Sequence, residues 1–229
     1  MIEVDAVRKH FVSGRGRKAK VIEAVRGVSF RATDARITAL LGPNGAGKTT
    51  TLRMAAALLE PDSGRILVDG IHVAARPQQA LARMGVLSDA RGLYPRLSAR
   101  ENIVYHARLH GMADEHAQAR AEQLARMLDF SALLERRTEG FSQGERMKTA
   151  LARALVHDPP NIVLDEPTNG LDVQSIRSLR DALRRLRDAV QRFIDAADDD
   201  EALKVDADCA AAVPRPRVFV PLAAAPSTR

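Results

Sequence analysis

The stretch that decides the fold is Gly42-Pro43-Asn44-Gly45-Ala46-Gly47-Lys48-Thr49-Thr50. It matches the pattern G-x-x-x-x-G-K-[ST] and lies between a short apolar run at residues 37–41 and an expected helix at about residues 48–59. The glycines let backbone N–H groups surround a phosphate, and the helix N-terminus adds the positive end of its dipole. The Lys48 ammonium can reach the β- and γ-phosphates, while the Thr49 hydroxyl can ligate Mg²⁺. The motif therefore predicts a nucleotide-binding loop in an α/β domain.

A second apolar run, Ile162-Val163-Leu164, ends in two carboxylates, Asp165 and Glu166, followed by Pro167. A P-loop needs an acidic partner for its Mg²⁺, and Asp165 is placed for that role. Glu166 is the natural general base for the attacking water. An Asp-Glu pair after a strand, taken alone, more often only ends the strand and has no catalytic role. Downstream of a nucleotide-binding loop, the functional interpretation is favoured.

A third motif, Phe141-Ser142-Gln143-Gly144-Glu145, precedes that acidic strand by some twenty residues. Ser142 and Glu145 have the spacing of a capping box at the start of a helix. A Ser at the N-cap beside a Gly also offers a hydroxyl and free backbone donors to an anion. An ordinary helix cap is the alternative. In this order with the other two motifs, the segment resembles the signature sequence of ABC ATPases, usually Leu-Ser-Gly-Gly-Gln.

The resemblance to the ATP-binding subunits of ABC transporters covers residues 1–189. It implies an α/β fold: a P-loop NTPase core of the ABC ATPase type, with an antiparallel β subdomain and an inserted helical subdomain at about residues 90–150. It also implies that Phe11 stacks on adenine, although a single Phe near a strand end is more often part of a core. Asn169-Gly170-Leu171-Asp172 matches the loop that communicates between paired subunits. Residues 89–94 look most like bacterial exporters of the sodium-extrusion kind.

In such proteins two subunits, identical or different, pair head to tail with ATP and Mg²⁺ between them. The resemblance implies that Ser142, Gln143, Gly144 and Glu145 of one subunit cover the ATP held by residues 42–50 of the other. Hydrolysis then drives a transmembrane permease subunit from the cytoplasmic face of the inner membrane. This predicts a peripheral export ATPase that does not act on nucleic acid.

Bulk properties exclude several other classes of protein. The net charge of +6 and pI near 10.0 invite a polyanion such as nucleic acid or an anionic membrane, but Arg residues are spread rather than clustered. A soluble ABC ATPase acting on nucleic acid or ribosomes is therefore a rival, suggested by charge alone. The single Cys209 excludes an internal disulfide framework. No signal peptide is evident, and no apolar run approaches the roughly 20 residues that span a bilayer.

Two positions depart from the family pattern. Where the family has a Gln that senses Mg²⁺ and the γ-phosphate, this chain has Ser88-Asp89. A carboxylate is still an oxygen ligand for Mg²⁺, so Asp89 is a candidate metal ligand. The family also has a further buried strand and then Ser-His, whose imidazole contacts the γ-phosphate. No His occurs here after His157.

Residues 190–229 therefore look atypical. The helix expected from residue 173 should end near residue 189, and no strand signal follows it directly. Ala- and Pro-rich segments then indicate a poorly ordered tail. Val218-Phe219-Val220 has strand character, but Pro221 limits it to a sheet edge. We expect an aberrant segment, from a shifted reading frame or truncation, with a divergent native tail as the rival. An ATP-binding subunit deficient in hydrolysis is the corresponding alternative function.

The remaining histidines show little metal-site spacing. His106 and His110 share one helix face at i and i+4, without an adjacent acidic ligand. The sequence favours solvated surface for both.

Overall fold

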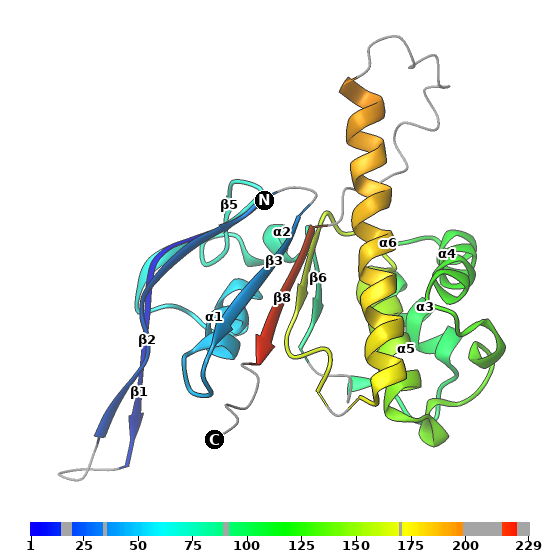
Figure 1. Cartoon of the computed structure of the whole chain (residues 1–229), viewed down its shortest axis with the longest axis horizontal. Helices are drawn as coiled ribbons and strands as arrows, with labels where there is room; N and C mark the ends of the chain where they lie inside the picture. The colour runs from blue at the N-terminus through cyan, green and yellow to red at the C-terminus, as the bar shows by residue number, and fades with distance from the viewer. Residues whose placement is uncertain (15–19, 34–35, 89–91, 170, 199–216, 224–229) are drawn as a thin grey trace.

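A computed structural model describes residues 1–14, 20–33, 36–88, 92–169, 171–198 and 217–223. It contains two sheets and a block of helices (Figure 1). The expected α/β class, with an antiparallel β part and a helical part beside a P-loop core, is confirmed. The boundary at residue 189 stays a prediction.

The first sheet is antiparallel, with the strand order β2-β1-β4-β5. Its strands are β1 (Ile2–Ser13), β2 (Lys20–Ala32), β4 (Ser63–Val68) and β5 (Ile71–His72). β1 and β2 are longer than the sequence suggested and pair along most of their length. Gly27, within β2, has a left-handed φ of 74°, which glycine adopts readily. This sheet lies to one side of the molecule in Figure 1.

The second sheet, called here the parallel sheet, has the strand order β3-β8-β7-β6. Its strands are β3 (Ile37–Gly42), β6 (Met84–Leu87), β7 (Asn161–Leu164) and β8 (Arg217–Ala223). All its pairs run parallel, so the carboxyl ends of β3 and β7 meet at one edge. In open α/β sheets this edge is where ligands bind.

The position of β8 corrects the expectation for the C-terminal segment. β8 pairs with β3 on one side and with β7 on the other, so the prediction of an edge strand is wrong. Pro221 is tolerated because the β7 pairing stops at Phe219, and Pro221 is in register only with Leu40 of β3. The premise of a missing strand is wrong as well, and the strand is separated from the preceding helix by residues 199–216.

The helices fall into two groups. α1 (Lys48–Ala55) and α2 (Pro77–Leu81) belong with the sheets. The helical lobe consists of α3 (Ala99–Leu109), α4 (Asp114–Met127) and α5 (Gln143–Leu155), with the short 3-10 turns Ser131–Leu133 and Thr138–Gly140. α6 (Val173–Asp198) runs beside this lobe in Figure 1. α6 continues past the predicted end at residue 189, whereas α1 stops before 59 because Ala57 has a left-handed φ of 55°.

Two helices begin with a capping box: the one predicted at Ser142 and a second at Ser98. Ser98 caps α3 and Ser142 caps α5, and in both the N3 Glu returns the hydrogen bond to the cap backbone. The side chains of these caps fix where the helical lobe begins and where the third motif starts.

Two apolar clusters form the core. One joins the antiparallel sheet to α1, β6 and Val163 of β7, so that α1 lies between the two sheets (Figure 1). The other fills the helical lobe and takes in Leu179, Leu183 and Leu186 from the apolar stripe of α6. Gly85 of β6 allows α5 to pack closely, because a Cβ there would lie 2.3 Å from the Ala154 carbonyl oxygen.

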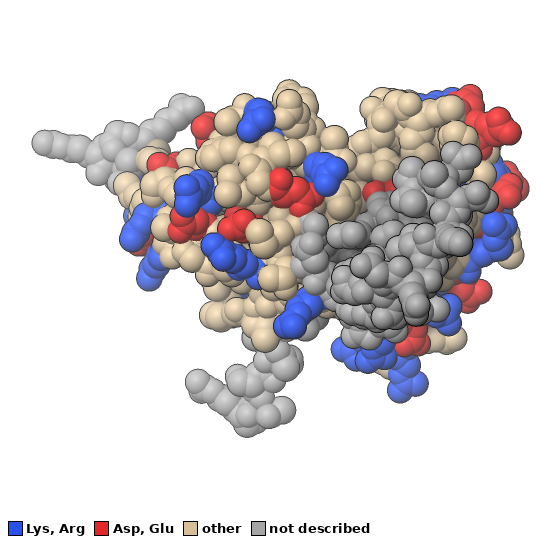
Figure 2. All heavy atoms as spheres, turned by 90° about the horizontal axis from the view of Figure 1, so that it is seen from above, with Lys and Arg blue, Asp and Glu red and all other residues tan. Residues whose placement is uncertain are grey.

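The surface mixes charges of both signs. On the face seen in Figure 2, Lys and Arg are interspersed with Asp and Glu, as on an ordinary solvated surface. In the described part of the chain, every helix is too short or too polar to serve as a membrane span.

Candidate functional site

The first site element is the nucleotide loop, residues 42–50, which leaves β3 and enters α1. Gly47 is the N-cap of α1, with φ 83° and no side-chain cap, so the first N–H groups of the helix are available to an anion. A Cβ at Gly47 would lie 2.3 Å from the Ala24 carbonyl oxygen of β2. Both the left-handed φ and this close approach require glycine. Gly45 shares the φ of 83°.

Lys48 is folded back over the nucleotide loop. Its Nζ donates to the Gly42 carbonyl at 2.8 Å and to the Pro43 carbonyl at 2.9 Å, and the residue is only 7% exposed. A buried ammonium needs such partners, because an unpaired buried charge is costly. The Lys48 ammonium thus lies against the loop to which the sequence analysis assigned phosphate binding.

The second site element is the end of β7, which lies beside the nucleotide loop. The Thr49 hydroxyl donates to Asp165 Oδ1 at 3.1 Å, across 116 residues of sequence. Partial burial raises the pKa of Asp165, and the Thr49 hydrogen bond opposes that shift. The structure therefore brings together the two residues that the sequence assigned to Mg²⁺.

Glu166 sits in a strained backbone conformation. Its φ of 47° is left-handed, which is uncommon outside glycine and clusters at functional sites. The conformation turns the chain sharply after β7, and Asn169 Nδ2 donates to Glu166 Oε2 at 3.4 Å. Asp165 and Glu166 thus have different partners, Thr49 and Asn169, although the two are adjacent in sequence.

The third motif begins α5. Ser142 Oγ accepts from the Glu145 backbone N–H at 3.3 Å, and Gln143 Nε2 donates to the Asn169 carbonyl at 3.3 Å. The second bond connects the third motif to the loop that follows β7. Gly144 packs so tightly that an added Cβ would lie 2.4 Å from Ser175 Oγ of α6. The start of α5 is therefore held against the loop and helix that follow the acidic residues.

Phe11 lies on β1, in register with Ile22 of β2, and is 42% exposed. β2, the strand paired with the one that carries Phe11, also contains Ala24, whose carbonyl lies against Gly47. Lys9 Nζ lies 6.0 Å from the centroid of the Phe11 ring. The ring is accessible from solvent, on the strand that pairs with the strand carrying Ala24.

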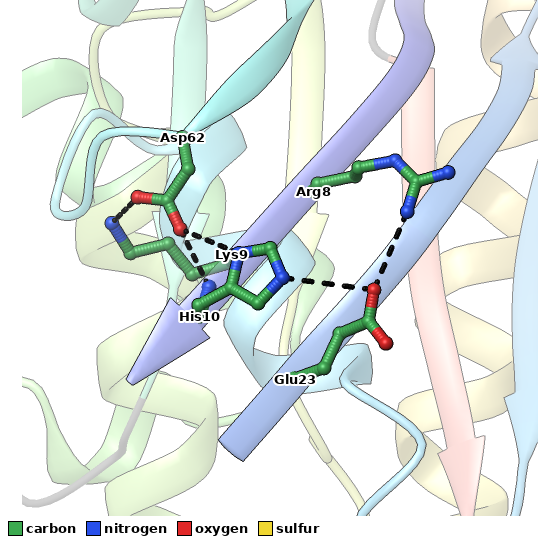
Figure 3. Close-up of polar contacts among 5 residues, drawn as sticks. All are labelled: Arg8, Lys9, His10, Glu23 and Asp62. Carbon is green, nitrogen blue, oxygen red and sulfur yellow. Dashed lines mark hydrogen bonds and ion pairs between the residues drawn. The ribbon is translucent and has the colours of Figure 1, made fainter. Parts of the chain in front are cut away.

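A polar cluster next to Phe11 ties β1 to its neighbours (Figure 3). Asp62 accepts from Lys9 Nζ at 2.7 Å and from the His10 backbone N–H at 2.6 Å. On the other side Glu23 meets Arg8 at 3.4 Å and His10 at 3.7 Å. The Lys9 hydrogen bond, aided by the His10 N–H, lowers the pKa of Asp62 to about 2. This cluster fixes the segment of β1 that carries Phe11.

Of two further residues, Asp89 was predicted from the sequence and Arg53 was not. Asp89 lies outside the described residues, so its metal role stays a prediction. Arg53 was missed; burial is the main cause that raises the pKa of Asp165, and the positive charge of Arg53 opposes this rise. Arg53 follows Thr49 by one helical turn on α1, and this i, i+4 spacing is the signal that could have identified it.

Comparison with known proteins identifies a family and several relatives. A family model described as ABC transporter matches residues 25–169. The ABC transporter ATP-binding protein NatA of Bacillus subtilis (strain 168) is 46% identical over 165 residues, covering 72% of this chain and 67% of NatA. The Nod factor export ATP-binding protein I of Paraburkholderia xenovorans (strain LB400) is 38% identical over 174 residues, covering 76% of this chain and 55% of that protein. The chain thus spans about two thirds of the first relative and little more than half of the second.

Solved structures share the fold. One is the dimeric post-hydrolysis state of the ATP-binding cassette MJ0796 bound to ADP and Pi, with a TM-score of 0.74 and 22% identity over 96% of this chain and 87% of that chain. Another is cbiO1 from Clostridium perfringens, part of the ABC transporter complex cbiONQ, with a TM-score of 0.73 and 19% identity over 97% of this chain and 78% of that chain.

Proposed function

The chain belongs to the ABC transporter family of ATP-binding proteins, and from this premise we propose that it hydrolyses Mg-ATP to drive export through a separate membrane subunit. The observation that supports the proposal most directly is the Thr49–Asp165 hydrogen bond of 3.1 Å. It joins the nucleotide loop to the acidic end of β7, which is the arrangement that Mg-ATP chemistry requires.

Each residue of the proposed site has a chemical role. Backbone N–H groups of residues 42–50 and the Lys48 ammonium hold the phosphates. Thr49 and Asp165 hold Mg²⁺, with Asp89 as a further oxygen ligand. Glu166 is the general base that takes a proton from the attacking water. Phe11 stacks on the adenine ring.

The proposed site is completed by a second subunit. The Ser142 hydroxyl and the first N–H groups of α5, with Gln143, Gly144 and Glu145 around them, cover the γ-phosphate of ATP bound to the partner. The similar MJ0796 cassette is dimeric, which is consistent with this pairing. ATP then favours the closed dimer and its products the open one, because a ligand shifts an equilibrium by its differential affinity.

The membrane partner is a transmembrane permease, with this chain attached peripherally at the cytoplasmic face. Support comes from the export proteins among the relatives and from the cbiONQ complex of a structural neighbour. The transported substrate is determined by the permease.

The composite site is tested by complementation between two variants. Lys48→Ala removes the phosphate-binding ammonium, and Ser142→Arg blocks the covering helix. Each variant alone is expected to lose most of its ATP turnover. A mixture of the two contains heterodimers in which one site has an intact loop from one subunit and an intact Ser142 from the other.

The expected result is turnover in the mixture well above the mean of the separate variants. Sedimentation with ATP confirms that dimers form. A mixture that only averages its components would overturn the shared site, and absence of turnover in the unmodified chain would overturn hydrolysis itself.

A further inference from the structure

Three histidines gather at the end of the helical lobe, outside the residues of the nucleotide site. His106 lies in the last turn of α3, His110 is its C-cap, and His157 follows α5. One ring nitrogen from each can be chosen so that all three lie within 4.8 Å of one another. The sequence suggested solvated surface for the first two because they lack an adjacent acidic ligand, and only the fold brings His157 to them.

The three rings form a compact group. The rings of His110 and His157 stack, with centroids 3.6 Å apart and planes 6° from parallel. The His106 ring meets that of His110 edge-on, with centroids 4.9 Å apart. Imidazole nitrogen is the commonest metal ligand in proteins, and three imidazole rings meet here.

The hydrogen bonding of His157 is that of a metal ligand. Its Nε2 lies 3.2 Å from the Met84 carbonyl oxygen, which can only accept, so Nε2 carries the proton. Its Nδ1 is then a lone-pair donor, and it is buried with no hydrogen-bond partner among the described residues. Buried polar atoms without partners are uncommon. A ligating His usually donates its other N–H to a carbonyl or carboxylate in this way.

We propose that His106, His110 and His157 form a binding site for a divalent transition-metal ion of the zinc type. Imidazole nitrogen suits zinc, nickel and copper, whereas Mg²⁺ prefers oxygen. The neighbouring carboxylate, Asp158, is engaged by Arg120 in an ion pair. Three protein ligands leave a fourth position to water or another ligand.

Metal binding requires a small rearrangement. Zinc–nitrogen bonds of about 2.1 Å in a tetrahedral site place ligand nitrogens roughly 3.4 Å apart, whereas the three nitrogens here lie within 4.8 Å of one another. A metal also lies in the plane of each imidazole ring, so stacked rings cannot both ligate it. His110 is the exposed member at the helix end, and it is the ring that turns out of the stack.

One nearby charge works against a cation. The positive charge of Arg153 acts on His106, although the Arg153 guanidinium also donates to the Gly92 carbonyl. We therefore expect affinity below that of closed structural zinc sites. A bound metal would connect α3 to the end of α5 and, through the His157–Met84 contact, to the start of β6.

The test uses the tag-free full chain and zinc alone as the probe, measured by titration calorimetry with Co²⁺ absorption as a second readout. The expected result is one zinc per chain, a tetrahedral-type Co²⁺ spectrum and a raised melting temperature. His106→Gln, His110→Gln and His157→Gln should each weaken binding at least about tenfold. His116→Gln, on the exposed face of α4, is the matched control and should leave binding unchanged.

His110→Gln is the decisive variant because its side chain is exposed and its loss should leave the metal-free melting temperature unchanged. Zinc binding by His110→Gln equal to that of the unmodified chain would overturn the proposal. The proposal would also be overturned if His116→Gln weakened zinc binding as much as the three variants do. Absence of zinc binding by the unmodified chain would overturn it too. None of these outcomes depends on ATP, so they leave the proposed ATPase function untouched.

Discussion

β7 and β8 are neighbouring parallel strands of one sheet, yet only β7 is followed by the residues that the proposed chemistry uses. β7 is buried along all four residues and ends at Asp165 and Glu166. β8 pairs with β7 and β3, but no His occurs anywhere after His157 in the sequence. A place in a parallel sheet requires a backbone that can pair, whereas a catalytic site requires particular residues at the strand end.

The largest expected effect is on stability, and it tests whether β8 is an interior strand. Phe219 is in register with Thr38 on one side and Val163 on the other. Phe219→Pro should destabilise the chain by about 3 kcal/mol or more, because proline removes a ladder donor and fits poorly inside a sheet. Urea denaturation followed by circular dichroism measures the change.

Arg217→Pro is the matched control, since proline is tolerated at the first residue of a strand. If both variants lose the same small amount of stability, β8 is not an interior member of the sheet and the comparison with β7 fails.

The next effect concerns nucleotide affinity at the end of β3. Lys48→Ala should weaken ATP binding by about 2 kcal/mol, on the order of thirtyfold in Kd, because a charged hydrogen-bond donor to the phosphates is lost. Titration with a fluorescent ATP analogue measures it, and the surface variant Lys20→Ala serves as the control. Equal ATP affinities in the two variants would show that Lys48 does not bind the phosphates.

Much of this site could be predicted because its motifs are local. The nucleotide loop, the acidic strand end and both Ser caps are short runs whose chemistry depends on adjacent residues. Their meeting, seen in the Thr49–Asp165 contact, followed from the rule that parallel strands end at one edge.

Other features depend on tertiary packing and gave no local signal. β6 was missed because Gly85 weakens its strand pattern, although α5 packs directly on that glycine. The position of β8 in the sheet was predicted wrongly, because the pairing that tolerates Pro221 can be seen only in the register of β3, β7 and β8. The roles assigned to Phe11, Asp89 and the third motif remain predictions.

A smaller effect concerns the packing that joins the third motif to α6. Gly144→Ala should cost about 1–2 kcal/mol, because the new methyl group overlaps Ser175 Oγ. Chemical denaturation measures the loss. The double variant with Ser175→Ala should recover part of it, and Gly140→Ala, which has open space around it, should cost less. No recovery in the double variant would show that the contact is not the cause.

The smallest effect is the pH dependence of the polar cluster at β1. The pKa of Asp62 falls from 3.8 to about 2 on folding, so the folded state favours its carboxylate. Its stabilising contribution is present above pH 3.8 and is lost as the pH falls toward 2. Asp62→Asn should therefore show a shallower loss of stability over that range in acid-denaturation curves. Lys9→Met, which removes the main cause of the shift, should behave likewise, and a curve as steep as that of the unmodified chain would contradict this assignment.

The central claim is that the end of β7 supplies the catalytic base for ATP hydrolysis in this chain. Steady-state Mg-ATP turnover by the purified chain, beside Glu166→Gln, tests it most directly. The prediction is measurable turnover that falls by about 10²–10⁴-fold in Glu166→Gln, with ATP affinity retained. Equal turnover in both proteins, or binding without turnover in the unmodified chain, would contradict it.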